Sequence, residues 1–439
     1  MTTRKTNLSR DFCEAVLATR ALVLLPGIST IANCPVVYEI SAGQPEIHRL
    51  GYLECADGIF VIGGESKEVP LKEAITIIES LFTDFLFLTP ADYSRAIAML
   101  ITPALVQGGF IRDRIPGDFA EADDSQAGKG YRHDLVAAVY NDKATLVTQN
   151  TGGVGSLDEK FAEALLTGKT FVRLDNLRDK LNSPTIESFF TTAYGFEFTA
   201  RAFRKSGKVK AGKNIIQASS NNATGTRDIA NRMCIVRIRK RPMNHPWTKF
   251  PEGHLLKHVQ ANQGKFLGAV HTIVMEWIRQ GKQCTNEHRH DFREWCGILD
   301  WILTNLFKRP GMMDGHQEIQ KRTSTPVVSA LRELAINLER DGKLPCDLLA
   351  SQIVELAVEY GIDLELRARD TETCARVLGG KLGSLFKRDG MLVTENLFRD
   401  EAIVVTIDEY QITRWLEKVL RDDGKGYHDT KHYRFMRKP

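Results

Sequence analysis

Hydrophobic and polar positions along this chain form two patterns, one typical of strands and one typical of helices. Between Gly117 and about Ile238, short apolar runs of strand composition are separated by longer segments with apolar residues at helical spacing. Strands that alternate with helices are typical of a parallel sheet with crossover helices. The pattern therefore predicts one α/β domain with five parallel strands. We expect these strands at 118–122, 145–148, 170–174, 214–218 and 234–238.

Helical spacing dominates the segments on either side. Helices are expected at 71–82 and 92–105, after the two strand-like runs VVYEI and GIFVI. Broad apolar faces return between 255 and 306, and again toward the C-terminus. There, an amphipathic basic helix over 371–388 precedes the strand-like run IVVTI and a basic end. Helices followed by a hairpin-like stretch predict a winged helix.

These patterns divide the chain into four expected parts. We predict a small N-terminal α+β domain (1–108), an α/β core (109–245), a helical segment (246–318) and a C-terminal winged-helix domain (319–439). A length of 439 residues is compatible with several domains, because single domains typically have roughly 100 to 200 residues.

Composition excludes several classes of protein. The chain is 43% hydrophobic and 26% charged, as in folded globular proteins, which excludes wholesale disorder. No apolar run reaches the roughly 18 residues of a membrane span, and the N-terminus lacks the apolar core of a signal peptide. The eight cysteines form no CxxC pair, as is typical of reduced thiols. We therefore expect a cytoplasmic protein without membrane contact.

Positive charge gathers in three segments, although the net charge is only +4. The first lies between 198 and 213, the second lies between 232 and 241, and the third follows Gly424. A single basic run is usually a solvated surface, but three in one chain indicate a polyanionic partner. The first segment carries no acid between 198 and 213, and its basic residues are Arg201, Arg204, Lys205, Lys208, Lys210 and Lys213.

A candidate phosphate loop follows the first of the five strands, in DFAEADDSQAGKGY. Gly128 and Lys129 stand between a strand and a helix, where loop amides, a helix N-terminus and a lysine bind phosphate. Two positions depart from G-x-x-x-x-G-K-[ST]: Asp123 replaces the first Gly, and Gly130 replaces the hydroxyl residue that binds magnesium. A helix-opening Gly-Lys without function stays an alternative. The candidate loop comprises Ser125, Gln126, Ala127, Gly128, Lys129, Gly130 and Tyr131.

A candidate magnesium site follows downstream. The strand in TFVRLDNL ends in Asp175, the position of the acid that holds magnesium in a Walker B strand. Asn176 stands where a Glu normally orients the attacking water. A strand-ending Asp is by itself more often a turn former or a helix cap.

Polar and basic residues after the fourth strand complete the pattern. Asn221 and Asn222 stand where a polar side chain can touch the terminal phosphate or orient water. Arg227 and Arg232 follow, and an arginine there can reach a neighbouring subunit's nucleotide. Each signal is weak alone, but their order and spacing favour an ATPase.

On these motifs the chain resembles AAA+ replicative helicases and initiators of phages, plasmids and staphylococcal cassette elements. Those proteins are related to minichromosome maintenance helicases, superfamily 3 helicases and primase-helicases. The resemblance implies a P-loop AAA+ core, a helical lid over 246–318, and a bacterial or phage-infected cell. The matching stretches are DFLFLTPADYSRAIAMLITP, QAGKGY, LDEKFAEALLTGKTFVRLDNLRDKLNSP, QASSNNATGTRDIANR, LLKHVQANQGKFLGAVHTIVMEWIRQGK and VLGGKLGSLF.

The resemblance also implies an activity. Such a protein is a DNA-dependent ATPase, usually a hexamer, which translocates on single-stranded DNA by hydrolysing ATP with Mg²⁺ at subunit interfaces. Carried over residue by residue, it assigns phosphate binding to Lys129, magnesium to Asp175, sensor 1 to Asn221 or Asn222, and the finger in trans to Arg227 or Arg232.

Two departures keep an alternative open. Gly130 removes a direct magnesium ligand, so the metal needs an additional water or a nearby oxygen such as that of Ser125. Asn176 cannot act as a base, which leaves Glu159 and Glu163 on the preceding helix, and the family pattern favours Glu159. The alternative is a nucleotide-binding, hydrolysis-poor loader or regulator that binds DNA.

The resemblance gives two basic regions a role with DNA. Residues 196–210 lie where these helicases insert a hairpin into the central pore; a solvated surface hairpin is the alternative. The winged helix would enter a major groove, or pack on the ring or on a partner protein. Priming would need a separate primase or polymerase. The expected DNA contacts are Arg201, Arg204, Lys205, Lys208 and Lys210 in the hairpin, and Lys381, Lys387 and Arg388 in the winged helix.

Overall fold

The computed structural model describes most of the chain. The described residues are 9–19, 26–54, 58–122, 126–148, 156–175, 183–192, 195–200, 204–220, 227–323, 325–364, 366, 370–386, 403–420 and 427–438.

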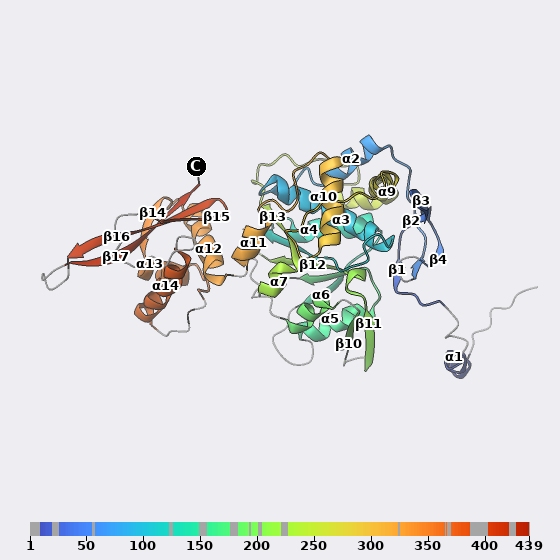
Figure 1. Cartoon of the computed structure of the whole chain (residues 1–439), viewed down its shortest axis with the longest axis horizontal. Coiled ribbons are helices and arrows are strands. Elements are labelled where there is room, and N and C mark those ends of the chain that lie inside the picture. Colours follow the sequence, from blue (N-terminus) through green and yellow to red (C-terminus); the bar gives the residue numbers. More distant parts are fainter. Residues whose placement is uncertain are drawn as a thin grey trace, which may run out of the picture.

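A mixed sheet forms the centre of the larger body (Figure 1). Among the described residues it has six strands in the order β6-β13-β7-β12-β9-β8, and neighbours are parallel except for β6 and β13. The five predicted strands are confirmed to within two residues at each end, whereas β6 was not expected. The strands are β6 (Leu86–Phe87), β7 (Gly117–Ala122), β8 (Thr145–Thr148), β9 (Phe171–Asp175), β12 (Ile215–Ser220) and β13 (Met233–Arg239).

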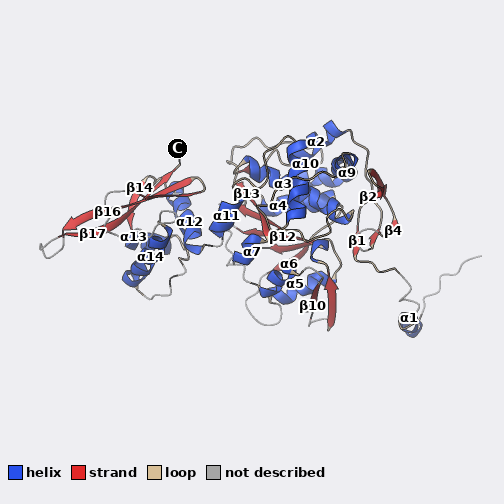
Figure 2. Cartoon of the chain, viewed as in Figure 1, coloured by secondary structure: helices blue, strands red, loops and turns tan. Residues whose placement is uncertain are grey.

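Helices cover both faces of this sheet, as Figures 1 and 2 show. One side carries α3 (Pro90–Gln107), α4 (Lys129–Val139) and α9 (Gln263–Arg279), and the other carries α5 (Leu157–Leu166), α6 (Pro184–Thr191) and α7 (Arg227–Asn231). From β7 the chain steps across β12 and β9 to β8. It then returns to β9 and to β12, and finally crosses β7 to reach β13. A right-handed crossover places its helix on one face of the sheet when the chain moves in one direction along the sheet, and on the other face when it moves back. This rule explains why the helices are divided between the two faces.

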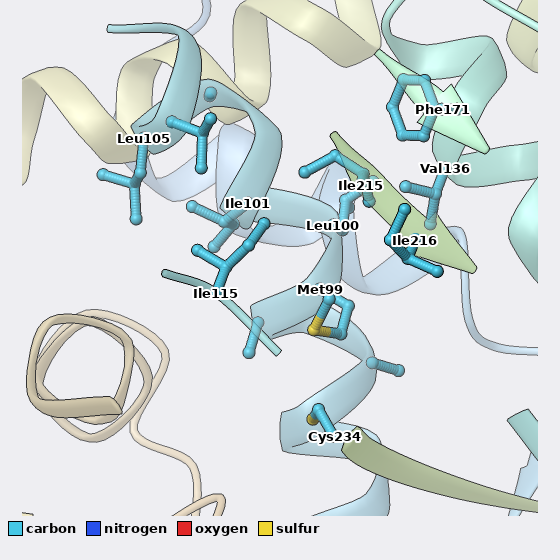
Figure 3. Close-up of a cluster of buried hydrophobic side chains, with 14 of the residues drawn as sticks. Met99, Leu100, Ile101, Leu105, Ile115, Val136, Phe171, Ile215, Ile216 and Cys234 are labelled. Carbon is cyan, nitrogen blue, oxygen red and sulfur yellow. The ribbon is translucent and has the colours of Figure 1, made fainter. Parts of the chain in front are cut away.

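Helix α3 lies at the centre of the main core. Thr89 and Asp92 form a capping box at its start, and every residue from Ser94 to Gln107 is buried. Figure 3 shows Met99, Leu100 and Ile101 among side chains of the sheet strands. Helix α2 (Leu71–Ser80) packs on α9 in the same core. The expected domain boundary at residue 108 therefore does not coincide with a break between cores.

The segment that precedes α2 contributes small sheets. Strands β1 (Thr30–Ala32), β5 (Ile59–Val61) and β4 (Gly51–Leu53) form one sheet with a small core of its own. Strands β2 (Val36–Ser41) and β3 (Gln44–His48) form a hairpin against α9. The runs VVYEI and GIFVI are thus confirmed as strands, within β2 and β5. An N-terminal helix, α1 (Arg10–Leu17), precedes them.

The predicted helices between 255 and 306 are present. They are α8 (Leu255–Ala261), α9 and α10 (Arg293–Asn305), and they share the core of the sheet. Helix α11 (His316–Thr323) leads from this body to the C-terminal part. None of the helices in the described part of the chain is long and apolar enough to span a membrane.

The C-terminal part has its own core, which extends from Val327 to Phe435. Its described strands form an antiparallel sheet in the order β14-β17-β16-β15, and the predicted strand IVVTI is β15. The predicted helix over 371–388 corresponds to α14. The elements are α12 (Pro326–Arg340), β14 (Cys346–Leu349), α13 (Ala350–Glu359), α14 (Thr371–Leu385), β15 (Ile403–Ile407), β16 (Tyr410–Leu420) and β17 (Tyr427–Arg437).

Candidate nucleotide site

The candidate phosphate loop joins β7 to α4 at the carboxyl edge of the sheet. Gln126 and Gly128 both have positive φ, 62° and 91°, and Gly128 is the N-cap of α4. Lys129 is the first residue of this helix. Left-handed residues before a helix turn successive amides in one direction, toward the helix N-terminus. The described part of the loop therefore has the form of an anion-binding turn.

The two glycines of the loop differ in what their surroundings permit. A Cβ at Gly128 would lie 3.2 Å from Cε1 of Phe85, and the positive φ alone already disfavours a side chain. A Cβ at Gly130 would meet nothing within 4 Å. The positive φ and the close contact therefore favour glycine at 128, whereas nothing near Gly130 obstructs a Cβ.

Several predicted site residues lie outside the description. The structure gives only the backbone of Asp175 and Arg227, so nothing follows about their side chains. The roles assigned to all of these residues stay predictions. The residues outside the described ranges are Ser125, Asn176, Arg201, Asn221, Asn222, Lys387 and Arg388.

The spatial order of the strands brings the backbone positions of the site together. β12 lies between β7 and β9, with Ser219 opposite Ala120 and Ala218 opposite Leu174. Asp175 follows Leu174, so it is two strands from β7, or roughly 10 Å at the usual spacing of strands. β12 ends at Ser220, directly before the predicted sensor. The chain also leaves β7 and β12 in opposite directions, and such a switch point is where open α/β sheets bind ligands.

Glu159 lies at the same edge of the sheet. It belongs to the first turn of α5, and its amide donates to the Ser156 hydroxyl at 3.4 Å. Because β8 runs toward the carboxyl edge and α5 returns from it, the start of α5 lies at this edge. Glu163 lies one turn further and accepts a hydrogen bond from Lys160 at 3.2 Å.

A buried ion pair holds α4 against β7 behind the loop. Asp118 of β7 pairs with Arg132 of α4, and Nε2 of His133 lies 3.6 Å from the Asp118 carboxylate. Burial alone would raise the pKa of Asp118, but Arg132 and His133 hold it at about 2. Burial lowers the pKa of His133 to about 4. At neutral pH the carboxylate is therefore charged and the imidazole is neutral.

A second polar contact ties α4 to the next strands. Arg173 of β9 lies 2.8 Å from the Asp134 carboxylate of α4, and its guanidinium donates to the Gln217 side chain of β12 at 3.3 Å. Sequence reasoning did not use these residues. The available signal was a polar residue inside an apolar strand, because such a residue must find a partner when it is buried.

Tyr131 links the loop helix to the helical segment. Its hydroxyl accepts a hydrogen bond from the Leu256 amide at 2.8 Å, at the start of α8. Its ring centroid is 6.4 Å from that of Phe85. Burial raises the pKa of Tyr131. The first turn of α4 and the first turn of α8 are therefore joined directly beside Lys129.

The predicted hairpin is confirmed as β10 (Phe196–Ala200) and β11 (Lys205–Val209). Phe196 and Phe198 are buried on one face, whereas Lys208 and Glu197 pair at 3.2 Å on the other. Arg204 at the turn has a φ of 50° and is exposed. Lys205, Lys208 and Lys210 are also exposed.

The hairpin and the phosphate loop lie at opposite edges of the sheet. The hairpin leads through a short 3-10 helix (Ala211–Lys213) into the beginning of β12, at the amino edge. The six residues of β12 span about 20 Å at the usual rise per residue. Strand β12 therefore connects the two edges, and α5, which begins at the carboxyl edge, also contacts the hairpin strand β10.

Arg232 lies at the amino edge as well. Its carbonyl accepts a hydrogen bond from the Gly117 amide at 3.0 Å, and its guanidinium lies 3.5 Å from the Asp291 carboxylate. The structure therefore does not bring Arg232 to the phosphate loop of its own chain. A contact with a neighbouring chain's nucleotide stays a prediction.

Lys381 is directed into its own domain. Its ammonium donates to the Leu364 carbonyl at 3.3 Å, and the residue is half-buried. This contact turns the side chain toward the connection after α13, and a contact of Lys381 with DNA stays a prediction.

Buried charges connect the C-terminal part to the carboxyl edge. Arg237 of β13 pairs with Asp92 of α3 at 3.1 Å and with Asp408, in the β15–β16 turn, at 2.6 Å. Burial would raise the pKa of Asp92, but Arg95 and Arg237 lower it overall. All of these side chains are at most 8% exposed. Sequence reasoning did not predict this contact between distant segments.

The same connection extends to the strand that leads into the phosphate loop. Arg332 of α12 lies 2.6 Å from the second Asp408 oxygen and 4.0 Å from the Glu121 carboxylate. Glu121 is the next-to-last residue of β7 and is in register with Arg237. The C-terminal part thus contacts the strand that feeds the loop.

Comparisons with known proteins give a structural likeness but no match by sequence. No family model matches the chain, and no curated protein sequence matches it. Among solved structures, the chain is similar to the active helicase Cch of SCCmec type IV, with 13% identity and a TM-score of 0.33. The likeness covers 96% of this chain and 82% of that one. A TM-score this low does not establish a common fold.

Proposed function

We propose that this chain is an AAA+ ATPase that acts as a DNA helicase or replication initiator of a mobile element. The order of the strands carries the proposal. A sensor must reach both the phosphate loop and the Walker B acid, and β12 lies between β7 and β9. Three adjacent strands end at one edge of the sheet. The phosphate loop follows β7, Asp175 is the last residue of β9, and the predicted sensor segment follows Ser220 of β12. This arrangement supports a single nucleotide site.

ATP with Mg²⁺ suits the chemistry of the residues at this edge. The amides from Gln126 to Lys129 would bind phosphate oxygens, and the Lys129 ammonium would neutralise their charge. Asp175 would hold the metal ion, and Glu159 would orient the attacking water or accept its proton. When bound, Mg²⁺ supplies charge neutralisation at the phosphates.

A neighbouring copy of the chain completes the site in this proposal. Arg232 lies at the amino edge, so it can meet only the nucleotide of another subunit. We propose that copies of the chain form a ring, a hexamer like those of the helicases that it resembles. In this ring, segment 246–318 acts as the lid. The hydrogen bond between Tyr131 and Leu256 supports this role, because it joins the lid to the loop helix.

DNA is the proposed partner. The exposed lysines of the β10–β11 hairpin would follow the backbone of a single strand in the pore. The three described helices and the antiparallel sheet of the C-terminal part support a winged helix, which would engage duplex DNA or a partner protein. Synthesis of primers would need a separate primase or polymerase.

Magnesium-dependent ATP hydrolysis, with and without single-stranded DNA, tests the proposal. Lys129→Ala is expected to lower turnover by about 10²-fold or more, because it removes a cation from the developing charge. Lys143→Ala, which changes an exposed lysine after the other end of α4, is the matched control. Turnover that survives Lys129→Ala, or that DNA does not stimulate, would contradict the proposed motor.

A hydrolysis-poor DNA-binding regulator is the second candidate, and Gly130 favours it. The position has room for a side chain, yet it lacks the hydroxyl that holds magnesium. Nucleotide binding without turnover in the wild type, with turnover restored in Gly130→Thr, would support this candidate. Gly130→Ala is the control, because it adds a Cβ without an oxygen.

A further inference from the structure

A hollow of about 460 Å³ lies beside the hairpin, between β11 and the turn that precedes β9. Leu165, Phe198 and Val209 contribute an apolar floor. Among the described residues that line it, none is an aspartate or a glutamate, and four are lysines. We call these the lysine groove: Lys169, Lys208, Lys210 and Lys213.

Two carboxylates interact with lysines of the groove from outside its lining. Glu197 binds Lys208 at 3.2 Å from the outer face of the hairpin. Asp142 interacts electrostatically with Lys169. Lys169, Lys208 and Lys210 are exposed, and Lys213 is half-buried. The groove therefore presents a concentration of positive charge to solvent.

The positive charge continues into a second hollow. A cavity of about 870 Å³ shares Lys210 and Lys213 with the groove and is also lined by Arg112 and Arg293. Its carboxylates include Glu294, which accepts hydrogen bonds from the amides of Arg112 and Asp113 at 3.0 and 2.8 Å. Its other acids are Glu39, held by Lys282 at 2.5 Å, together with Glu54 and Asp113.

The chemistry of the groove selects its ligand. Several cations around an apolar floor suit a chain of phosphates whose sugars and bases bring apolar surface. The groove joins the base of the hairpin that the proposed function places on single-stranded DNA. A strand that leaves the hairpin would meet Lys210 and Lys213 first and Lys169 beyond them.

We propose that the lysine groove binds the phosphate backbone of single-stranded DNA at the amino edge of the sheet, as a second contact beyond the hairpin tip. The inference rests on the proposed function, because it takes the hairpin as the first contact. It assigns Lys169 and Lys213, which lie outside the hairpin, to the DNA path. The contact is to phosphates, so it is independent of base sequence.

Fluorescence anisotropy of labelled oligo(dT) over a range of salt concentrations tests the inference in the full-length protein. Each phosphate contact on a single strand contributes about 0.7 to the slope of log K against log salt. We expect Lys169→Ala and Lys213→Ala each to lower the slope by about 0.7 and to weaken binding several-fold. A mixed-sequence oligonucleotide should respond in the same way.

Two further variants separate the possible outcomes. Lys72→Ala changes an exposed lysine on α2, on the other side of the sheet, and should leave the slope unchanged. Lys205→Ala changes the hairpin tip. If the wild type binds and Lys205→Ala lowers the slope while both groove variants leave it unchanged, the groove inference is wrong and the proposed function stands. If the wild type does not bind oligo(dT), the proposed function itself fails.

An acidic polypeptide is the competing ligand. Poly-glutamate labelled in the same way distinguishes it, because groove variants that lose poly-glutamate but keep oligo(dT) would overturn the inference. Circular dichroism melting of each variant monitors folding. If Lys213→Ala melts early, Lys213→Gln keeps the packing of the stem and still removes the charge.

Discussion

The two edges of the central sheet carry charge in opposite ways. At the carboxyl edge, Arg237 and Arg332 are buried, and Asp408 binds both. At the amino edge, the lysine groove is open to solvent and lacks a carboxylate among its described lining residues. A buried charge must be paired, so it serves to hold segments together. Exposed cations keep their attraction for an external polyanion.

The largest effect should come from removing the acid at the carboxyl edge. Asp408→Asn removes the charged partner that Arg237 and Arg332 share, whereas Asp92 still pairs with Arg237 and Glu121 stays 4.0 Å from Arg332. Breaking buried pairs of this kind costs up to about 3–5 kcal/mol. We expect the C-terminal part to detach from the sheet, measured as faster limited proteolysis and a lower melting temperature. Asp429→Asn, at an exposed position on β17, should change neither. Equal behaviour of the two variants would show that the buried pairs of Asp408 do not hold the C-terminal part on the sheet.

A pH titration of stability tests the pairing behind the loop. The pKa of His133 is about 4, below its ordinary value of 6.5, so the unfolded chain binds more protons between these values. The contribution of neutral His133 to the free energy of unfolding is therefore complete above pH 6.5 and is lost as pH falls toward 4. The pKa of Asp118 is about 2, below its ordinary 3.8, and its contribution is lost as pH falls from 3.8 toward 2.

The melting temperature should therefore fall as pH is lowered from 6.5, and less steeply in His133→Asn than in the wild type. Buried His271 and His290, with pKa values of about 3 and 4, contribute in the same direction. One variant consequently removes only part of the slope. An unchanged slope in His133→Asn would contradict the neutral, buried imidazole.

The loop glycines give a matched pair with a smaller effect. Gly128→Ala places a Cβ at positive φ and 3.2 Å from Phe85, and should cost about 1–2 kcal/mol. Gly130→Ala fills open space near the start of α4 and should be neutral or stabilise by up to about 1 kcal/mol. Thermal denaturation measures both. Equal destabilisation would show that the loop does not adopt the described backbone.

The smallest effect is expected at the amino edge. Glu197→Gln removes the carboxylate that binds Lys208, an exposed pair that contributes roughly 0–1 kcal/mol. Stability should stay nearly constant, whereas oligo(dT) should bind up to several-fold more tightly at low salt. Weaker binding in Glu197→Gln would indicate that the carboxylate orders the hairpin for its partner.

The sequence by itself determined the local elements of this protein. Apolar periodicity predicted the five parallel strands, the helices between 255 and 306 and the strand β15, because it reports which side of a segment is buried. Gly128 and Lys129 identified the loop, since a turn at positive φ before a helix has a distinct composition. The hairpin was expected from the resemblance, because the helicases in question insert one between Asp175 and the fourth strand.

Only the tertiary structure decided which distant segments meet. Along the chain, β9 with Asp175 comes between β7 and β12, but in the sheet β12 lies between β7 and β9. This pairing brings the phosphate loop, Asp175 and the predicted sensor segment to one edge. Helix α3, which was expected in a separate domain, is buried in the core of the sheet. The pairing of Asp408 with Arg237 and the meeting of Lys169 with Lys213 depend on the same packing. Local pattern shows that a charge or an apolar face needs a partner, whereas the free energy of long-range packing selects which partner it receives.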